Sequence, residues 1–125
     1  MWRLKNNNVA KWAKKERVTD SDLIAACQEI ERGLFDADLG GGLIKKRVAI
    51  QGRGKSGGSR TLVAYKKGKR ILFLYGFKKN QRSNITDKEE RLLKEVAKEF
   101  FKRTEKELAH LVACEVYFEL ESYDE

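Results

Sequence analysis

Two hydrophobic periodicities divide the chain. In its first third, apolar residues recur three and four positions apart, which places them on one side of a helix. This spacing predicts a short helix over Val9–Arg17 and a second helix over Asp22–Gly33, with Thr19 or Ser21 as its N-cap. The glycines of Leu39–Gly42 then end helical structure and open a loop.

From residue 43 the period changes to two. Apolar and basic residues alternate over Leu43–Ile50, and β-branched and aromatic residues fill Ser59–Lys67 and Lys69–Lys78. Gly68 supplies a tight turn between the last two segments. Three strands in succession predict an antiparallel meander.

The helical period returns after residue 86. Two Thr-x-x-Glu patterns are typical of capping boxes at helix starts: Thr86 with Glu89, and Thr104 with Glu107. The first helix is expected to end near Arg103, and the alternation in Cys114–Leu120 predicts a last strand. The fold class is therefore α+β, and 125 residues are expected to form one domain spanning 1–125.

The charge is concentrated in the predicted sheet. Residues 39–86 hold 13 Lys and Arg and no Asp or Glu, whereas the chain as a whole carries a net charge of +8. The segment before residue 39 has seven basic and seven acidic residues, and the segment after residue 86 has seven basic and twelve acidic ones. A basic centre between neutral and acidic flanks is typical of a protein that binds a polyanion.

The remaining composition points to the cytoplasm. Cys27 and Cys114 are not clustered, so we expect buried free thiols in a reducing compartment rather than a metal site. His110, the only histidine, is expected to be a packed residue. No apolar run is long enough for a membrane span, and the polar N-terminus does not resemble a signal peptide.

Strand alternation sorts the basic and aromatic side chains onto faces. Lys45 and Arg47 share a face of the first strand, and Arg60 heads the second strand. Three aromatic residues are expected on one face of the third strand: Phe73, Tyr75 and Phe77. One sheet face must pack on helices, and the other is predicted to be open, with cations for RNA phosphates and rings for unpaired bases.

The loop Gln51–Ser59 is rich in glycine and carries Arg53 and Lys55. Glycine lets backbone N–H groups approach an anion closely. The segment lacks the spacing of a nucleotide-binding P-loop and precedes a strand rather than a helix, which argues against that interpretation.

A long segment resembles a known family. The stretch "GLIKKRVAIQGRGKSGGSRTLVAYKKGKRILFLYGFKKNQRSNI", followed by a helix opening "TDKEE", is similar to the core of the RelE/ParE toxin superfamily. Its glycine-rich G-x-G-K-x-G-G-x-R segment resembles the HigB-like branch most. The resemblance covers roughly Thr19–Lys102, and no first strand is evident before it.

This resemblance implies a toxin of a type II toxin-antitoxin system. Members of the RNase branch enter the ribosomal A site and cut mRNA there, without a metal or other cofactor. The ribose 2′-OH attacks the adjacent phosphate, and Arg and Lys stabilise the charge that develops. The implied partners are the ribosome, mRNA and a cognate antitoxin, expected to be a helix-turn-helix HigA-like protein.

Site residues follow from the matching positions. Arg60 matches the arginine at the end of the turn before the central strand and is expected to stabilise the phosphate. The other implied catalytic residues are Arg53, Lys55, Lys79 and Tyr75. The expected RNA contacts are Lys45, Lys46, Arg47, Lys66, Phe77, Lys78, Asn80 and Arg82.

Two departures from the family pattern leave the general acid and base open. Asn80 stands where some relatives have another arginine, and Thr86 where some have a tyrosine. Lys55, Lys79 and Tyr75 are the candidates, since a lysine near other cations can have a lowered pKa. Two other functions stay open: a ParE-like toxin that inhibits DNA gyrase, and a non-catalytic RNA-binding module.

Overall fold

The molecule is a mixed sheet with helices on both faces. The computed structural model describes residues 1–50 and 54–121, without the side chains of residues 54–57. The six strands are ordered β2-β3-β4-β5-β1-β6. The elements are β1 (Trp2–Asn6), α1 (Asn7–Glu16), α2 (Asp20–Glu31), β2 (Ala37–Gly40), β3 (Leu43–Ile50), β4 (Gly54–Lys66), β5 (Arg70–Lys78), α3 (Asp87–Lys102), α4 (Glu105–Ala113) and β6 (Tyr117–Glu119). The predicted α+β class is confirmed.

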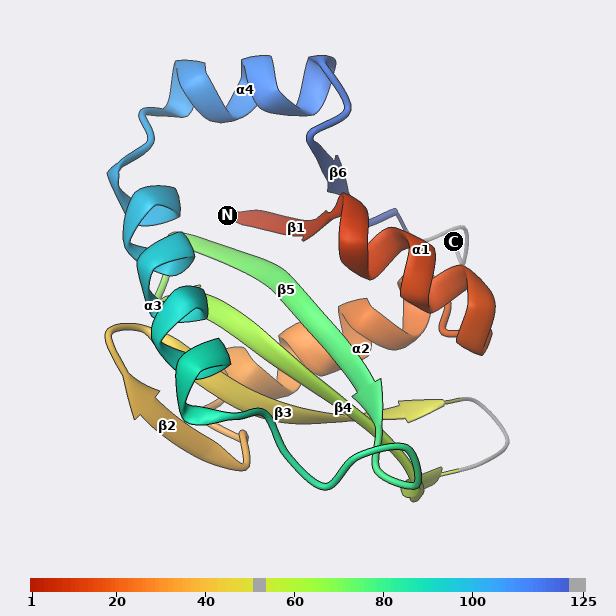
Figure 1. Ribbon diagram of the computed structural model, residues 1–125. Coiled ribbons are helices and arrows are strands. Elements are labelled where there is room, and N and C mark those ends of the chain that lie inside the picture. Colours follow the sequence, from red (N-terminus) through yellow and green to blue (C-terminus); the bar gives the residue numbers. More distant parts are fainter. Residues whose placement is uncertain (51–53, 122–125) are drawn as a thin grey trace.

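Both faces of the sheet pack against helices, so the expectation of one fully open face is wrong. Buried side chains of α1 and α2, such as Ile30, pack with Val63 and Phe73 on one face. On the other face, Phe100 of α3 and Leu108 of α4 pack with strand residues such as Leu62. In Figure 1, α2 lies behind the sheet, α3 lies in front of it, and α4 connects α3 to β6.

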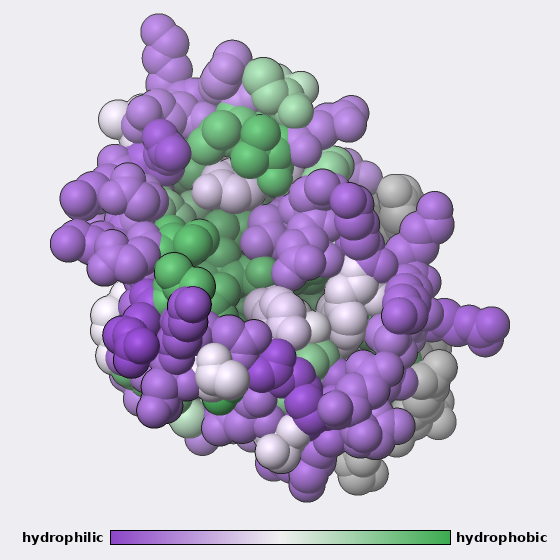
Figure 2. Space-filling model, in the orientation of Figure 1, coloured by the Kyte–Doolittle hydropathy of each residue, from purple (hydrophilic) through white to green (hydrophobic). Residues whose placement is uncertain are grey.

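The helix α3 covers only part of its face. Ala97 and Phe100 are its buried residues, whereas Leu92 and Val96 remain 57% and 45% exposed. Figure 2 shows hydrophobic side chains in a hollow beside α3, bordered by hydrophilic ones. Some strand residues on the α3 side stay partly exposed, and this part of the sheet carries the candidate site.

The strand β1 was not expected from the sequence. It pairs parallel with β5, with Leu4 opposite Leu72, and antiparallel with β6. Leu4 is fully buried, but its neighbours are polar, so the segment lacks a clear strand pattern. The strand ends at Asn6, whose side chain accepts a hydrogen bond of 2.8 Å from the Val9 amide and caps α1.

Helix boundaries follow the caps. Thr19 and Asp22 form a capping box, so α2 begins at Asp20, two residues before the predicted start. The two capping boxes predicted at Thr86 and Thr104 are confirmed. The Thr86 hydroxyl accepts a 3.1 Å hydrogen bond from the Glu89 amide, and the Thr104 hydroxyl accepts one of the same length from the Glu107 amide.

The central meander is confirmed, with changes at its edges. The strands β3, β4 and β5 are antiparallel neighbours, and β3 has the predicted bounds. The segment Ala37–Gly40, expected to lead into a loop, adds β2 at the edge of the sheet. The last strand, predicted over Cys114–Leu120, is the shorter β6.

An irregularity in β5 changes which aromatic residues share a face. The register between β4 and β5 shifts between Leu62 and Val63: Leu62 lies opposite Tyr75, but Val63 lies opposite Phe73. One residue of β5, Leu74, is therefore passed over, as in a β-bulge. Phe73 packs toward α2, while Tyr75 and Phe77 pack on the α3 side, so the three rings predicted on one face are divided between two.

Two further expectations, for Cys114 and His110, need correction. Cys27 is buried as predicted, and burial raises the pKa of its thiol to about 12. Cys114 is exposed, and so is His110, whose Nε2 lies 3.5 Å from the Cys114 Sγ. Arg70, next to the turn at Gly68, is only 8% exposed. No helix among the described residues is long and apolar enough to cross a membrane.

Candidate RNA-binding face

Two rows of side chains cross the accessible part of the sheet on the α3 side. In the first row, Arg47 of β3 lies opposite Arg60 of β4, which lies opposite Phe77 of β5. In the second row, Lys45 lies opposite Leu62, which lies opposite Tyr75. Directly opposite residues of antiparallel strands point to the same side of a sheet. The structure thus brings five predicted site residues together: Lys45, Arg47, Arg60, Tyr75 and Phe77.

Arg60 occupies the centre of the first row. Its side chain is partly exposed, yet its NH1 nitrogen is buried and has no hydrogen-bond partner in the described part of the chain. A buried donor without a partner is costly, and a guanidinium presents its N–H groups in a fork that matches the oxygens of a phosphate. Arg60 therefore places a partly exposed guanidinium at the centre of the face, where it can meet an anion.

Arg82 comes from the segment between β5 and α3 and extends back across the sheet. Its NH1 and NH2 donate to the two carboxylate oxygens of Glu89, at 3.0 and 2.6 Å. NH1 also donates to the Tyr75 hydroxyl at 3.2 Å, and Nε donates to the Asn84 carbonyl oxygen at 2.9 Å. The hydrogen bonds to Glu89 and then to Tyr75 raise the pKa of Arg82.

The guanidinium of Arg82 lies over two aromatic rings. Its Cζ is 6.0 Å from the centroid of Tyr75 and 5.8 Å from that of Phe77. The two rings are themselves in contact, with centroids 6.0 Å apart. Arginine over ring faces is a favourable cation–π arrangement. Phe77 is only 3% exposed, so its ring supports Arg82 rather than facing solvent.

Carboxylates reach this face from outside the meander. Asp36 accepts from the Arg47 backbone N–H at 2.6 Å and from its Nε at 2.9 Å. Burial alone would raise the pKa of Asp36, but these hydrogen bonds from Arg47 lower it overall. Glu89 likewise accepts hydrogen bonds from the Arg82 side chain, and these lower the pKa of Glu89 to about 2. The absence of acids from residues 39–86 therefore does not leave every cation unpaired.

Two predicted RNA contacts lie on the opposite face of the sheet. The Lys46 side chain is 4% exposed, and its Nζ pairs with Glu29 at 2.7 Å and donates to the Leu34 carbonyl oxygen. Lys78 pairs with Glu16 of α1 at 3.5 Å. Both lysines attach helices to the sheet, and the structure does not bring them to the row of Arg60.

The other predicted site residues are scattered. Lys66 is exposed at the opposite end of β4, beside Arg70. Lys79 and Asn80 are exposed after β5, and the Lys79 amide donates to the Gly58 carbonyl oxygen at 2.7 Å. Arg53 and the side chain of Lys55 lie outside the described residues.

Glu89 is the site residue that the sequence did not reveal. Its pattern with Thr86 predicts a helix cap, which the structure confirms. Its second contact, with Arg82, depends on how the segment before α3 turns back over β5. A basic residue seven positions before a capping glutamate would be the only signal, and it is a weak one.

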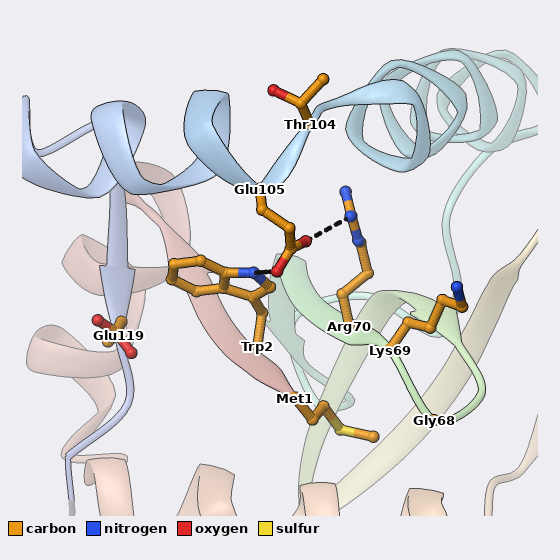
Figure 3. Close-up of a pocket in the computed structure, with 8 residues that line it drawn as sticks. All are labelled: Met1, Trp2, Gly68, Lys69, Arg70, Thr104, Glu105 and Glu119. Atoms are coloured by element: carbon orange, nitrogen blue, oxygen red, sulfur yellow. Dashed lines mark hydrogen bonds and ion pairs between the residues drawn. The ribbon is translucent and has the colours of Figure 1, made fainter.

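A cavity of about 700 Å³ lies at the end of the sheet away from Arg60. Figure 3 shows that Trp2 and Arg70 both point at Glu105, with their nitrogens 2.9 Å from its oxygens. Arg70 also donates to the carbonyl oxygens of Phe100 and Arg103 at the end of α3. These contacts hold the junction of α3 and α4 on the sheet, so we assign them a structural role.

Among the described residues, no group of three or more His, Cys, Asp or Glu side chains could hold a metal ion. The site is instead a set of cations over aromatic rings. Such an arrangement can bind a phosphate chain and can stabilise negative charge that develops on it.

The fold and this face define a small basic α+β protein with a cation–aromatic site on its sheet. The chain matches the family described as the RelE toxin of the RelE/RelB toxin-antitoxin system over residues 1–120, and it belongs to that family. The match extends the resemblance seen over Thr19–Lys102 to include β1 and β6. A search of curated proteins gave no match.

Proposed function

We propose that this RelE-family toxin is a ribosome-dependent endoribonuclease of the HigB type that cuts mRNA in the cytoplasm. The family assignment supports a toxin. The observation that carries the enzymatic part is the place of Arg60, which lies opposite Arg47 on one side and Phe77 on the other and keeps its guanidinium partly exposed on this face. An RNA phosphate is the ligand that fits the guanidinium of Arg60 and the cations beside it.

In the proposed reaction, the ribose 2′-oxygen attacks the adjacent phosphorus. A bond from the 2′-oxygen to phosphorus forms, the bond to the 5′-oxygen of the next nucleotide breaks, and the 2′-OH proton passes to a base. Arg60 stabilises the charge on the phosphorane oxygens, which is electrostatic catalysis by a preorganised donor. No metal or cofactor takes part in this mechanism.

The proton donor and acceptor are proposed among Tyr75, Lys79 and Lys55. Tyr75 is the candidate best supported by the geometry, because it lies on the same face as Arg60 and its hydroxyl accepts a hydrogen bond from Arg82. The phenolic proton therefore stays available for donation to the leaving 5′-oxygen. Lys79 is exposed beside the start of β4 and can approach from the rim of the face.

The proposed partners are the ribosome, mRNA and a cognate antitoxin. The family name implies a RelB-type antitoxin, and the HigB-like segment favours a helix-turn-helix protein of the HigA type. Either antitoxin would silence the enzyme by covering the cationic face or by displacing its residues. The toxin alone should therefore arrest growth, and co-expressed antitoxin should restore it.

The test is a translation reaction with purified protein, in which mRNA 5′ ends are mapped by primer extension. The wild type should cut within ribosome-occupied codons and leave naked RNA intact. Arg60→Ala should lose cutting while its circular dichroism spectrum stays native. Lys67→Ala, which removes one exposed cation at the far end of the sheet, is the matched control and should cut normally.

Two outcomes would overturn the proposal. Full cutting by Arg60→Ala would remove the phosphate-stabilising role of that residue. Intact mRNA with arrested growth would remove the RNase function altogether. A DNA damage response in the same cells would then favour inhibition of DNA gyrase.

A further inference from the structure

Glu89 makes two different sets of contacts with one carboxylate. Its Oε1 accepts the Thr86 backbone N–H at 2.7 Å, which closes the capping box of α3. The same oxygen accepts from NH2 of Arg82 at 2.6 Å, and Oε2 accepts from NH1 at 3.0 Å. The carboxylate thus joins the start of α3 to the guanidinium over the sheet.

Arg82 has almost no remaining capacity for another ligand in this arrangement. A guanidinium has five N–H donors. Four hydrogen bonds of Arg82 go to Glu89, Tyr75 and Asn84, which leaves one N–H without a partner among the described residues. Its charge is matched by the charge of Glu89. A phosphate therefore cannot bind Arg82 through two parallel hydrogen bonds while Glu89 holds the same nitrogens.

Carboxylates and phosphates bind arginine through the same paired N–H···O geometry. The Glu89 carboxylate occupies the position that a phosphate would take on Arg82. The ion pair is also accessible: the Arg82 and Glu89 side chains are 29% and 36% exposed. Exposed ion pairs are weak, so an RNA phosphate with further contacts to Arg60 and Lys45 can compete for Arg82.

We propose that Glu89 is a positioning residue that holds Arg82 over Tyr75 and Phe77 and yields it to an RNA phosphate when RNA binds. This inference rests on the proposed function in taking RNA as the ligand. On release, Glu89 keeps its hydrogen bond to the Thr86 amide, so α3 stays capped. Arg82 then exchanges one oxyanion for another, and the helix itself does not unfold.

Glu89→Gln separates the two contacts of this residue. The glutamine oxygen can still accept the Thr86 amide and preserve the cap. It lacks the charge and the second acceptor oxygen that hold Arg82. The variant should therefore bind a short fluorescent single-stranded RNA roughly twofold to fivefold more tightly than the wild type at low ionic strength, as expected for removal of an exposed competing pair.

The chain offers a matched control. Glu107 closes the capping box of α4 in the same way, with its Oε1 2.8 Å from the Thr104 amide. It also lies 3.7 Å from Arg103, outside the candidate site. Glu107→Gln removes the same charge from an equivalent cap, so unchanged RNA affinity in this variant excludes a mere effect of net charge.

Arg82→Ala completes the test as a double-mutant cycle. If Glu89 acts through Arg82, then Glu89→Gln should raise RNA affinity in the wild type and have no effect in Arg82→Ala. Equal gains in both backgrounds would show a general electrostatic effect and overturn the proposal. Absence of any gain, including failure of every variant to bind RNA, would overturn it as well. If the loss of the Glu89 charge frays α3, the helical circular dichroism signal should fall in Glu89→Gln and stay unchanged in Arg82→Ala.

The outcome is distinguishable from failure of the proposed enzymatic function. The binding cycle uses RNA without ribosomes, whereas cleavage is measured on translating ribosomes with Arg60→Ala. A protein that never cuts mRNA can still show the exchange at Arg82. Conversely, the protein can be an active RNase and still lack the exchange at Arg82. In that case its RNA affinity would not respond to Glu89→Gln.

Discussion

At Gly76, β5 packs closely against Trp12 of α1. A methyl group built on its Cα would lie 2.5 Å from both Cδ2 and Cζ3 of Trp12. Gly76 is buried between Tyr75 and Phe77, and its backbone is not in the left-handed region. Gly76→Ala is therefore a steric test of how tightly α1 is packed on β5.

The expected cost can be worked out from this contact. Carbon atoms pack best at about 3.5–4.0 Å, so the Trp12 ring must move by about 1 Å. Overpacking a core in this way costs about 1–3 kcal/mol. Replacing glycine in a strand recovers about 0.5–1 kcal/mol of chain entropy. A displacement of this size places the overpacking cost in the upper part of its range, about 2–3 kcal/mol. The net loss of unfolding free energy should therefore be about 1–2.5 kcal/mol, which lowers the Tm by roughly 4–10 °C.

The assay is thermal and urea denaturation of Gly76→Ala, Trp12→Leu and the double variant. Shrinking the ring removes the clash, so Gly76→Ala should cost little or nothing in the Trp12→Leu background. The two changes are thus expected to be strongly non-additive. A wild-type Tm in Gly76→Ala, or the same loss with and without the tryptophan, would refute the close packing of α1 on β5.

Three further predictions follow from burial and charge. Phe100→Ala, at a fully buried position of α3, should lower the free energy of unfolding by about 3–5 kcal/mol, as measured by urea denaturation. The Glu89 carboxyl should titrate near its pKa of about 2 in carbon NMR. Because this pKa is lower in the folded state than in the unfolded state, the ionised carboxylate stabilises the fold at pH values above the usual glutamate pKa. This stabilisation is lost as the pH falls toward 2. That contribution should be absent in Glu89→Gln. Iodoacetamide at neutral pH should alkylate the exposed Cys114 and spare Cys27, because burial raises the pKa of Cys27 to about 12. Mass spectrometry of tryptic peptides measures the modification of each cysteine, and alkylation of Cys27 before Cys114 would contradict the prediction.

Local signals in the sequence were enough for most elements. The Thr-Glu pairs at residues 86 and 104 satisfy helix N–H groups within one turn, so their chemistry is visible in four residues. The alternation of Leu43–Ile50 likewise depends only on neighbours in the chain. The strand β1 was missed because it is stabilised by β5 and β6, which are far away in sequence.

The site was predictable in composition but not in geometry. The alternation placed Lys45 and Arg47 on one face of their strand, and the register of β3 with β4 adds Arg60 to that face. The irregularity at Leu74 has no sequence signature, and it moves Tyr75 and Phe77 onto the face of Arg60. The burial of Lys46 and the contact of Arg82 with Glu89 depend on partners from other elements, which periodicity cannot show.

The place of β1 in the sheet also has a consequence for the order of synthesis. Of the six strands, β1 leaves the ribosome first, yet it lies between β5 and β6, whose residues are made only from positions 70 and 117 onward. Because β6 spans Tyr117–Glu119, the nascent chain cannot complete the sheet until residue 119 has been translated. A polypeptide released early would leave β1 as an unprotected edge, so premature termination should yield aggregation-prone fragments rather than a smaller folded toxin.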